Sequence, residues 1–250
     1  MGKPGREMAA RHIPRLREAH GLDVVVANGE NAAGGLGITP RLLDELFRDG
    51  VDAITLGNHT WRKKELAPQI DEYDCVARPA NYAPGVPGQG SVILEGVTDP
   101  PLAVLNLIGR VYMDPAECPF IKGREEVERL REVTPLVLVD FHGEATAEKV
   151  AMGWHLDGKC TAVVGTHTHV PTADERVLPG GTAYITDVGM TGPLDSVIGM
   201  ERSRVLRRFI TGMPEEFRVA TERPALCGVI ITADPETGKA LSIKRVQCIE

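Results

Sequence analysis

Five short apolar runs in this chain are each followed directly by polar side chains that could bind a metal ion or a substrate. Apolar runs of strand length that alternate with amphipathic helical patterns predict an α/β fold with a mostly parallel sheet. In such sheets the binding crevice lies outside the carboxyl ends of the strands, so these polar groups are expected to meet at one edge. The runs and their polar successors are 24–27 with 28–31, 53–56 with 57–59, 136–139 with 140–144, 162–164 with 165–169, and 183–185 with 186–192.

The histidines among these polar groups favour a metal centre. Four of the seven histidines follow the runs, namely His59, His142, His167 and His169. A His-x-His pair on an extended segment places both rings on the same side, where they can serve one metal ion or two. Imidazole and carboxylate ligands suit zinc, iron or manganese. Each motif alone is equally compatible with a surface pair or a capped turn, so the prediction rests on their convergence.

At these residues the chain resembles a known enzyme superfamily. Gly-Asn-His at 57–59 and Gly-Thr-His-Thr-His at 165–169 resemble two blocks of the calcineurin-like metallophosphoesterases. The stretches 27–35, 140–146 and 186–193 are more narrowly similar to the YmdB-type branch. The resemblance spans nearly the whole chain. It implies one metallophosphoesterase domain over 1–250, built as an α/β two-sheet sandwich flanked by helices, with mixed, mostly parallel sheets.

The resemblance also implies a role for each candidate residue. It implies two divalent or transition metal ions, with iron or manganese favoured and zinc as an alternative. His59 is implied to stand beside the leaving group rather than to bind metal. Asn31, Asp187 and Thr191 are candidates for contact with the substrate or for support of the ligands. The implied metal ligands are Glu30, which bridges both ions, Asn58, His142 and His167, which complete the second site, and His169, which belongs to the first.

The activity implied by the resemblance is hydrolysis of small phosphodiesters, in this branch 2′,3′-cyclic nucleotides. The expected mechanism is attack by a metal-bound hydroxide while His59 assists the leaving group. One alternative is a phosphomonoesterase or nucleotidase that uses the same site. Another is a non-catalytic, nucleotide-binding regulatory protein. A zinc-dependent hydrolase of carbon–nitrogen bonds fits less well, because the block 57–59 does not suit it.

One departure from the family pattern concerns the start of the chain. The family opens with a strand that ends in Gly-Asp-x-x-Gly, and the Asp of that block is a ligand of the first metal. This chain starts with residues 1–5, Met-Gly-Lys-Pro-Gly, which resemble the end of the block. Asp23 is the only Asp before Glu30, and it leads into the second strand at the wrong end. As given, the sequence lacks the first strand and that ligand, so we expect either that its start is mis-assigned or truncated, or that the first metal site is weakened.

The composition and charge of the chain limit the kinds of partner that it is expected to bind. The net charge is −7 and aromatic residues make up 4% of the chain, which argues against a long nucleic acid as ligand. A small anionic nucleotide remains compatible, since bound cations reverse the local field. No apolar stretch approaches the roughly 20 residues of a membrane span, and the start lacks a secretory apolar region, so a cytoplasmic protein without a membrane partner is expected. Five cysteines without a CxxC pair indicate free thiols.

A few elements can be placed from the sequence. A helix is expected over 6–20, with a kink or break at Pro14. A second helix is expected to begin at Thr39-Pro40. The Pro- and Gly-rich stretch 79–90 is predicted to be a loop, and 226–232 with 241–249 an antiparallel hairpin. That closing hairpin could pair with a second copy, so a homo-oligomer is left open.

Overall fold

A six-stranded sheet forms one layer of the molecule, and its order is β4-β5-β6-β7-β9-β8. The computed structural model describes all residues from 1 to 250. Four neighbouring strands run parallel and the two edge strands run antiparallel to them. The strands are β4 (Ser91–Leu94), β5 (Leu102–Ile108), β6 (Leu136–His142), β7 (Ala162–Thr166), β8 (Arg176–Val177) and β9 (Ala183–Ile185).

The second layer of strands is divided into two small sheets. One is parallel, with the order β1-β2-β3, and the other is antiparallel, with the order β10-β11-β12. The expected sandwich of mixed, mostly parallel sheets is confirmed, and so is the closing hairpin, which is β11 with β12. The strands are β1 (Val26–Asn28), β2 (Ala53–Thr55), β3 (Val76–Ala77), β10 (Gly192–Pro193), β11 (Pro224–Ala233) and β12 (Ala240–Ile249).

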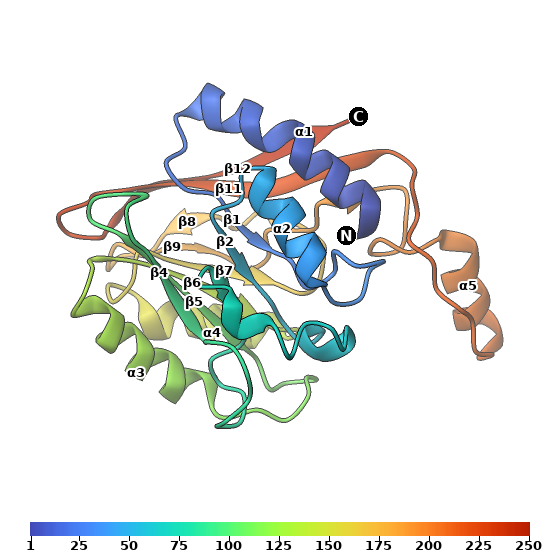
Figure 1. Ribbon diagram of the computed structural model, residues 1–250, viewed down its shortest axis with the longest axis horizontal. Coiled ribbons are helices and arrows are strands. Elements are labelled where there is room, and N and C mark those ends of the chain that lie inside the picture. Colours follow the sequence, from blue (N-terminus) through green and yellow to red (C-terminus); the bar gives the residue numbers. More distant parts are fainter.

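Helices cover both outer faces of the two strand layers (Figure 1). Helices α1 (Gly2–His20) and α2 (Pro40–Arg48) lie over the divided layer, and α3 (Pro119–Arg131) and α4 (Thr146–Leu156) lie under the six-stranded sheet. Helix α5 (Arg202–Thr211) stands away from the body as an arm. Two short 3-10 turns, η1 (Thr60–Arg62) and η2 (Ile70–Glu72), follow β2.

The first helix differs from its prediction in two respects. It begins at Gly2 rather than at residue 6, and Pro14 lies inside it without ending it. Thr39-Pro40 does start α2, and 79–90 contains no helix or strand, as expected.

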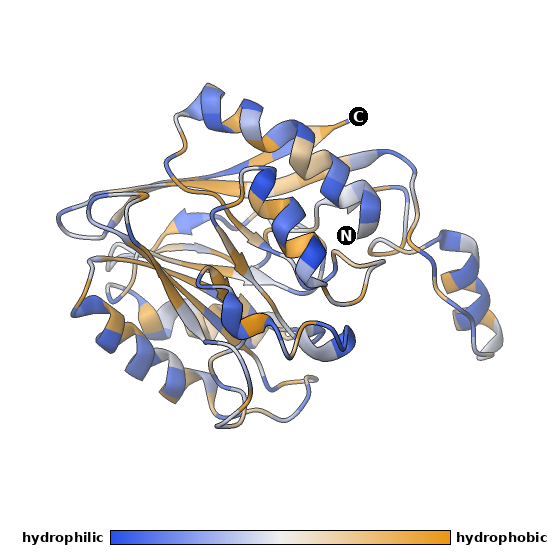
Figure 2. Cartoon of the chain, viewed as in Figure 1, coloured by the Kyte–Doolittle hydropathy of each residue, from blue (hydrophilic) through white to orange (hydrophobic).

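The burial pattern explains the continuous apolar runs in the sequence. Strand β7 is buried at every position and β5 at all but its first residue, because helices cover one face of the sheet and the second strand layer covers the other. The central strands therefore show as hydrophobic in Figure 2, whereas the exposed edge strand β8 and the outer faces of the helices carry hydrophilic residues. At roughly 25 cal/mol per Å² of apolar surface, this burial is the main driving force for the sandwich.

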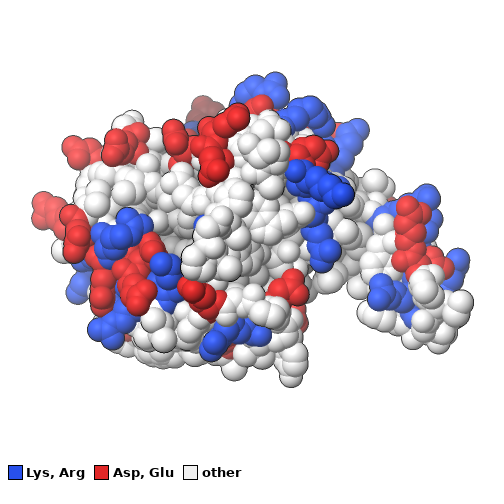
Figure 3. Space-filling model, turned by 60° about the horizontal axis from the view of Figure 1, so that its bottom comes forward, with Lys and Arg blue, Asp and Glu red and all other residues white.

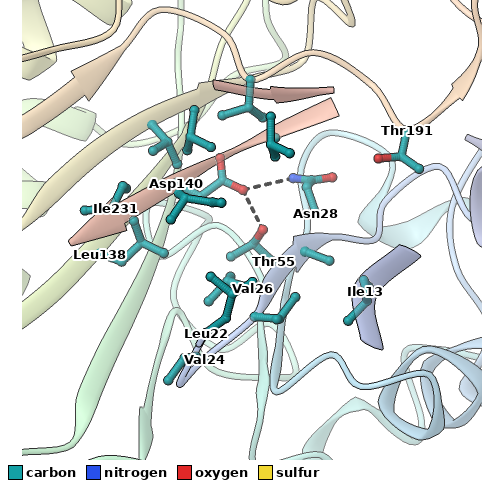
Figure 4. Close-up of a pocket in the computed structure, with 18 of the residues that line it drawn as sticks. Ile13, Leu22, Val24, Val26, Asn28, Thr55, Leu138, Asp140, Thr191 and Ile231 are labelled. Atoms are coloured by element: carbon teal, nitrogen blue, oxygen red, sulfur yellow. Dashed lines mark hydrogen bonds between the residues drawn. The ribbon is translucent and has the colours of Figure 1, made fainter. Parts of the chain in front are cut away.

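A cavity of about 980 Å³ lies where the divided layer leaves two strand edges apart. Strand β1 pairs with β2 alone, and β11 pairs with β10 only through Pro224 and Ala225. The free edges of β1 and β11 both line the cavity, together with α1 and the inner face of β6. Figure 4 shows the apolar side chains that point into it, and at its polar end the cavity reaches the ligand cluster described below. The labelled apolar residues are Ile13, Leu22, Val24, Val26, Leu138 and Ile231.

Surface and thiol chemistry add two facts. Basic and acidic side chains are interspersed on the face shown in Figure 3 rather than gathered into a basic stripe. All five cysteines are free, and Cys160 and Cys227 are buried as core thiols.

None of the helices combines the length and the apolar character that a membrane span requires.

Candidate metal centre

The polar groups after four parallel strands meet at one edge of the sandwich. Glu30 follows β1, Asn58 follows β2, His142 ends β6 and His167 follows β7. The Nε2 atom of His142 lies 2.9 Å from Asn58 Oδ1, 3.0 Å from His167 Nδ1 and 3.3 Å from Glu30 Oε1. Ligand atoms of Glu30, His142 and His167 all lie within 4.8 Å of one another. The structure therefore brings together all four predicted ligands of the second site.

The chemistry of this donor set fits a cation. His167 Nε2 lies 3.1 Å from Glu144 Oε2, an acceptor that favours a hydrogen on Nε2 and leaves the lone pair on Nδ1, which faces the cluster. Asn58 and Glu30 contribute oxygen lone pairs from the other sides. Four electron-pair donors that face one another repel unless a proton or a metal ion lies among them. Two imidazoles, an amide oxygen and a carboxylate form a set that suits zinc, iron or manganese.

The close approach of these ligands requires a glycine at position 57. A Cβ on Gly57 would lie 2.4 Å from both Glu30 Oε2 and His142 Nε2. Real Cβ atoms essentially never come this close to other heavy atoms, and both neighbours are themselves buried. The absence of a side chain at Gly57 is therefore what lets the carboxylate and the imidazole share one space.

Asn31 joins the cluster to His169. Its Nδ2 lies 3.1 Å from Glu30 Oε1 and 3.1 Å from His169 Nε2, and its Oδ1 lies 2.8 Å from His59 Nδ1. Because His169 Nδ1 donates to the Ile198 carbonyl at 2.9 Å, its Nε2 carries the lone pair that faces inward. His169 thus stands beside the cluster but across Asn31 from it.

The backbone of the His-x-His segment adopts an unusual conformation. His167 has φ of 101° and His169 has φ of 68°, both in the left-handed region that L side chains rarely adopt. Asp187 holds the residue between them, because Asp187 Oδ2 accepts hydrogen bonds from Thr168 N at 3.1 Å and Thr168 Oγ1 at 2.8 Å. Lys149 Nζ, also buried, lies 2.7 Å from the same oxygen. A fixed loop of this kind stores strain that the surrounding structure must offset.

Electrostatics in the cluster follow from burial and from close partners. Burial alone would raise the pKa of Glu30, but the interactions with His142 and then His59 hold that pKa well below its usual range. Burial would lower the pKa of His142, yet the Glu30 charge raises it. Burial and the neighbouring His142 lower the pKa of His167 to about 4. Burial likewise lowers the pKa of His169. Neutral His167 and ionised Glu30 are the forms in which these groups bind metal.

Two residues that were predicted to contact the substrate or support the ligands lie outside the ligand cluster. Asp187 does not contact the ligand atoms and acts through the loop instead. Thr191 turns away from the cluster, since its Oγ1 donates to the Cys227 carbonyl of β11 at 3.4 Å and its own carbonyl accepts from the Met1 nitrogen at 2.6 Å.

Sequence reasoning assigned no role to five polar residues that surround the ligands. They are Thr55, Asp140, Glu144, Lys149 and Thr166. Asp140, Glu144 and Thr166 stood in the polar blocks after their strands, so the available signal was their place at the strand ends. Burial raises the pKa of Asp140, and His142 with three hydrogen-bond donors opposes that rise.

Comparison with known proteins places this chain in a family. The model of the YmdB-like protein family matches residues 1–246. A Bacillus subtilis protein described as a 2′,3′-cyclic-nucleotide 2′-phosphodiesterase is 47% identical over 246 residues, which are 98% of this chain and 93% of that protein.

Two solved structures are similar in both fold and sequence. The structure of a hypothetical protein from Thermus thermophilus matches with a TM-score of 0.92 and 42% identity, over 100% of this chain and 96% of that one. The structure of a novel phosphatase from Mycoplasma pneumoniae matches with a TM-score of 0.92 and 35% identity, over 99% of this chain and 90% of that one. The chain therefore belongs to the YmdB-like protein family and is an enzyme of the phosphoric diester hydrolase class.

Proposed function

We propose that this enzyme is a metal-dependent phosphodiesterase that hydrolyses small phosphodiesters, with 2′,3′-cyclic nucleotides as the substrate class. The observation that carries the proposal is the partly buried cluster of Glu30, Asn58, His142 and His167, whose lone pairs converge. The cyclic-nucleotide specificity is supported by the Bacillus subtilis relative, which bears that activity in its description.

The residues present would hold metal unequally. Glu30, Asn58, His142 and His167 would hold one ion, which corresponds to the second site of the expected pair. His169 with Glu30 would hold the other through two protein ligands, so we propose a firm site and a weak one. Iron or manganese is the proposed metal, and zinc is the alternative. When bound, the ions would supply neutralisation of the phosphate charge and a nucleophile at neutral pH.

His59 is proposed to act on the leaving group. Its Nδ1 donates to Asn31 Oδ1 at 2.8 Å and its backbone N–H donates to Glu30 Oε2 at 3.0 Å, so the ring is held at the edge of the cluster. Its Nε2 has no hydrogen-bond partner in the protein. In the imidazolium form of the ring, which carries a hydrogen on both nitrogens, that atom would give its proton to the departing alkoxide oxygen, and a general acid of this kind contributes about 10²–10⁴-fold.

Asn58 is proposed to bind through its neutral amide oxygen. A carboxylate in its place would add a negative charge beside Glu30 and weaken the attraction for an anionic phosphodiester. A partner that is a small anionic nucleotide therefore fits the site, whereas a long nucleic acid would need a basic surface.

The test compares two histidine variants. The metal content and the rate on 2′,3′-cyclic AMP are measured with added Mn²⁺ for the parent, His59→Ala and His167→Ala. His59→Ala should keep its metal and lose about 10²–10⁴ in rate, because it lacks only the acid. His167→Ala should lose metal from the firm site. An unchanged rate in His59→Ala with equal metal content would exclude the general-acid role.

Two competing functions share this site and are separated by the same assay. Nucleoside 2′- and 3′-monophosphates turned over faster than 2′,3′-cyclic AMP would point to a phosphomonoesterase or nucleotidase. Nucleotide binding without turnover under added Mn²⁺ would point to a regulatory protein, the outcome favoured if the weak site is never filled.

Three further proposals concern the whole chain. We treat residues 1–250 as one metallophosphoesterase domain, because both strand layers contribute ligands. The free cysteines support a reducing compartment, so the cytoplasm is the proposed location. Self-association is proposed through the arm α5, on which Phe209 and Ile210 are 76% and 80% exposed.

A further inference from the structure

A chain of buried hydrogen bonds leads away from the ligand cluster through the ring of His142. His142 Nδ1 lies 2.9 Å from Thr166 Oγ1, and Thr166 Oγ1 lies 2.6 Å from Asp140 Oδ1. All three residues are buried. The parallel register of β6 and β7, which pairs His142 with Thr166, brings these groups together.

In this series of hydrogen bonds, Asp140 is an acceptor. Its other oxygen, Oδ2, accepts hydrogen bonds from Asn28 Nδ2 at 3.0 Å and from Thr55 Oγ1 at 2.5 Å, and Figure 4 shows both. An amide N–H can only donate, and the hydroxyl of Thr55 has no other acceptor than Asp140. Several donors that point at one carboxyl group favour its ionised form, which has no proton to give.

The hydroxyl of Thr166 has a single proton, and this fixes the direction of the remaining hydrogen bond. If the Thr166 hydroxyl donates this proton in a hydrogen bond to ionised Asp140, Thr166 Oγ1 can offer only a lone pair to His142 Nδ1. Nδ1 must then carry the hydrogen, and Nε2 carries the lone pair. The opposite tautomer would leave two oxygens 2.6 Å apart with no proton between them, or would require a protonated Asp140.

We propose that Asp140 and Thr166 are positioning residues that hold neutral His142 as its Nδ1–H tautomer and so direct its Nε2 lone pair at the metal. This proposal rests on the proposed metal-dependent function in one respect, namely that the group bound by His142 Nε2 is a metal ion. Without the two residues, Nε2–H would be drawn to the oxygens of Asn58 and Glu30, which lie 2.9 and 3.3 Å away, and the ring could not bind a cation there. A partner that orients a metal-binding histidine in this way typically contributes about 10- to 100-fold in metal affinity.

The first test reads the tautomer directly and needs no variant. Long-range ¹H–¹⁵N correlation spectra of the metal-free protein, labelled at histidine, are recorded at a pH where the His142 ring is neutral. His142→Gln identifies its signals. The expected pattern is a protonated Nδ1 and an unprotonated Nε2. A protonated Nε2 in the neutral ring would overturn the proposal.

The second test uses substitutions at Thr166 and titration with Zn²⁺ alone. Thr166→Val removes the acceptor but keeps the shape, and we expect a shift to Nε2–H and a loss of zinc affinity of about 10- to 100-fold. Thr166→Ser retains the hydroxyl and should restore both. Asp140→Asn should also shift His142 to the Nε2–H tautomer. The side-chain amide can donate to Thr166 Oγ1, and the Thr166 hydroxyl can then donate to His142 Nδ1. Zinc affinity within about twofold of the parent in Thr166→Val would contradict the proposal, since a positioning partner is worth at least about tenfold.

A matched control separates positioning from stability. Thr161 is also buried on the β7 side, where its Oγ1 accepts from Val137 N at 3.0 Å, far along the strand from the ligands. Thr161→Val should cost similar stability and leave the His142 tautomer unchanged. If the parent shows the Nδ1–H tautomer but binds no metal, the proposed function fails while the proposed tautomer stands. If the parent binds metal but shows the Nε2–H tautomer, the proposed function stands and the proposed tautomer fails.

Discussion

The substitution Gly57→Ala tests whether the cluster depends on the closeness of Glu30 and His142. The new Cβ would lie 2.4 Å from an atom of each residue, whereas ordinary contact begins near 3.4 Å, so each group must move by about 1 Å. Both side chains are only 1% exposed and have little room to move. Overpacking of this kind costs about 1–3 kcal/mol, and for a chain of this size that lowers Tm by roughly 2–12 °C.

The larger effect is expected on metal binding. Metal–ligand distances tolerate deviations of about 0.2 Å, so a displacement of about 1 Å at two ligands should remove the site. The assay is calorimetric titration of the purified protein with Mn²⁺ and Zn²⁺, beside a thermal melt of the metal-free form. We expect a loss of at least about 100-fold in affinity, the upper end of what even indirect disturbance of a ligand costs.

Gly228→Ala is the matched control for this experiment. Gly228 lies in β11, and a Cβ there would meet nothing nearer than Val246 Cγ1 at 3.7 Å. It should bind metal like the parent. If Gly57→Ala bound metal with parental affinity and kept its Tm, then the close approach of Glu30 and His142 would have no bearing on the site, and the reasoning about the lone pairs would be wrong.

Three other results are expected. Lys149→Met leaves the buried Asp187 without its cation and should cost about 3–5 kcal/mol in urea unfolding; a change below about 1 kcal/mol would show that the pair is dispensable. Burial raises the pKa of Tyr82 from 10.0 to about 12, so its stabilising effect is present below pH 10 and is lost as the pH rises through 12. Burial raises the pKa of Tyr184 to about 12 as well, so a tyrosinate absorbance titration should show a late step whose amplitude Tyr82→Phe reduces, and an unchanged amplitude would refute the assignment. The double substitution Phe209→Ser and Ile210→Ser should abolish concentration-dependent association in sedimentation velocity, whereas a parent that sediments as a monomer at all concentrations would exclude the arm as an interface.

The sequence was informative about the strand ends because each one combines two strong signals. A buried parallel strand is a continuous apolar run, and the polar block after it marks the edge at which ligands collect. Glu30, Asn58, His142 and His167 could be placed together on this ground, aided by the family blocks, and the structure brings them within hydrogen-bonding distance.

The supporting residues were harder to predict because their partners are set by register and by packing. Thr166 reaches His142 only because β6 and β7 pair in one particular register, and a slip by one residue would turn it to the other face. Lys149 belongs to a helix, and only the docking of α4 on β7 brings its side chain to Asp187. The left-handed backbone at His167 and His169 carries no signal in the residue types, since neither position is a glycine.

The cavity between β1 and β11 has a consequence for how this protein responds to hydrostatic pressure. Unfolding removes internal voids, and the volume change of unfolding becomes more negative as the void volume grows. The cavity of about 980 Å³ is partly open to water, and the part that stays dry between the apolar side chains of β1 and β11 should lower the midpoint of pressure unfolding. The two halves of the divided layer would be the first parts to yield, because no strand joins β1 to β11 across the cavity.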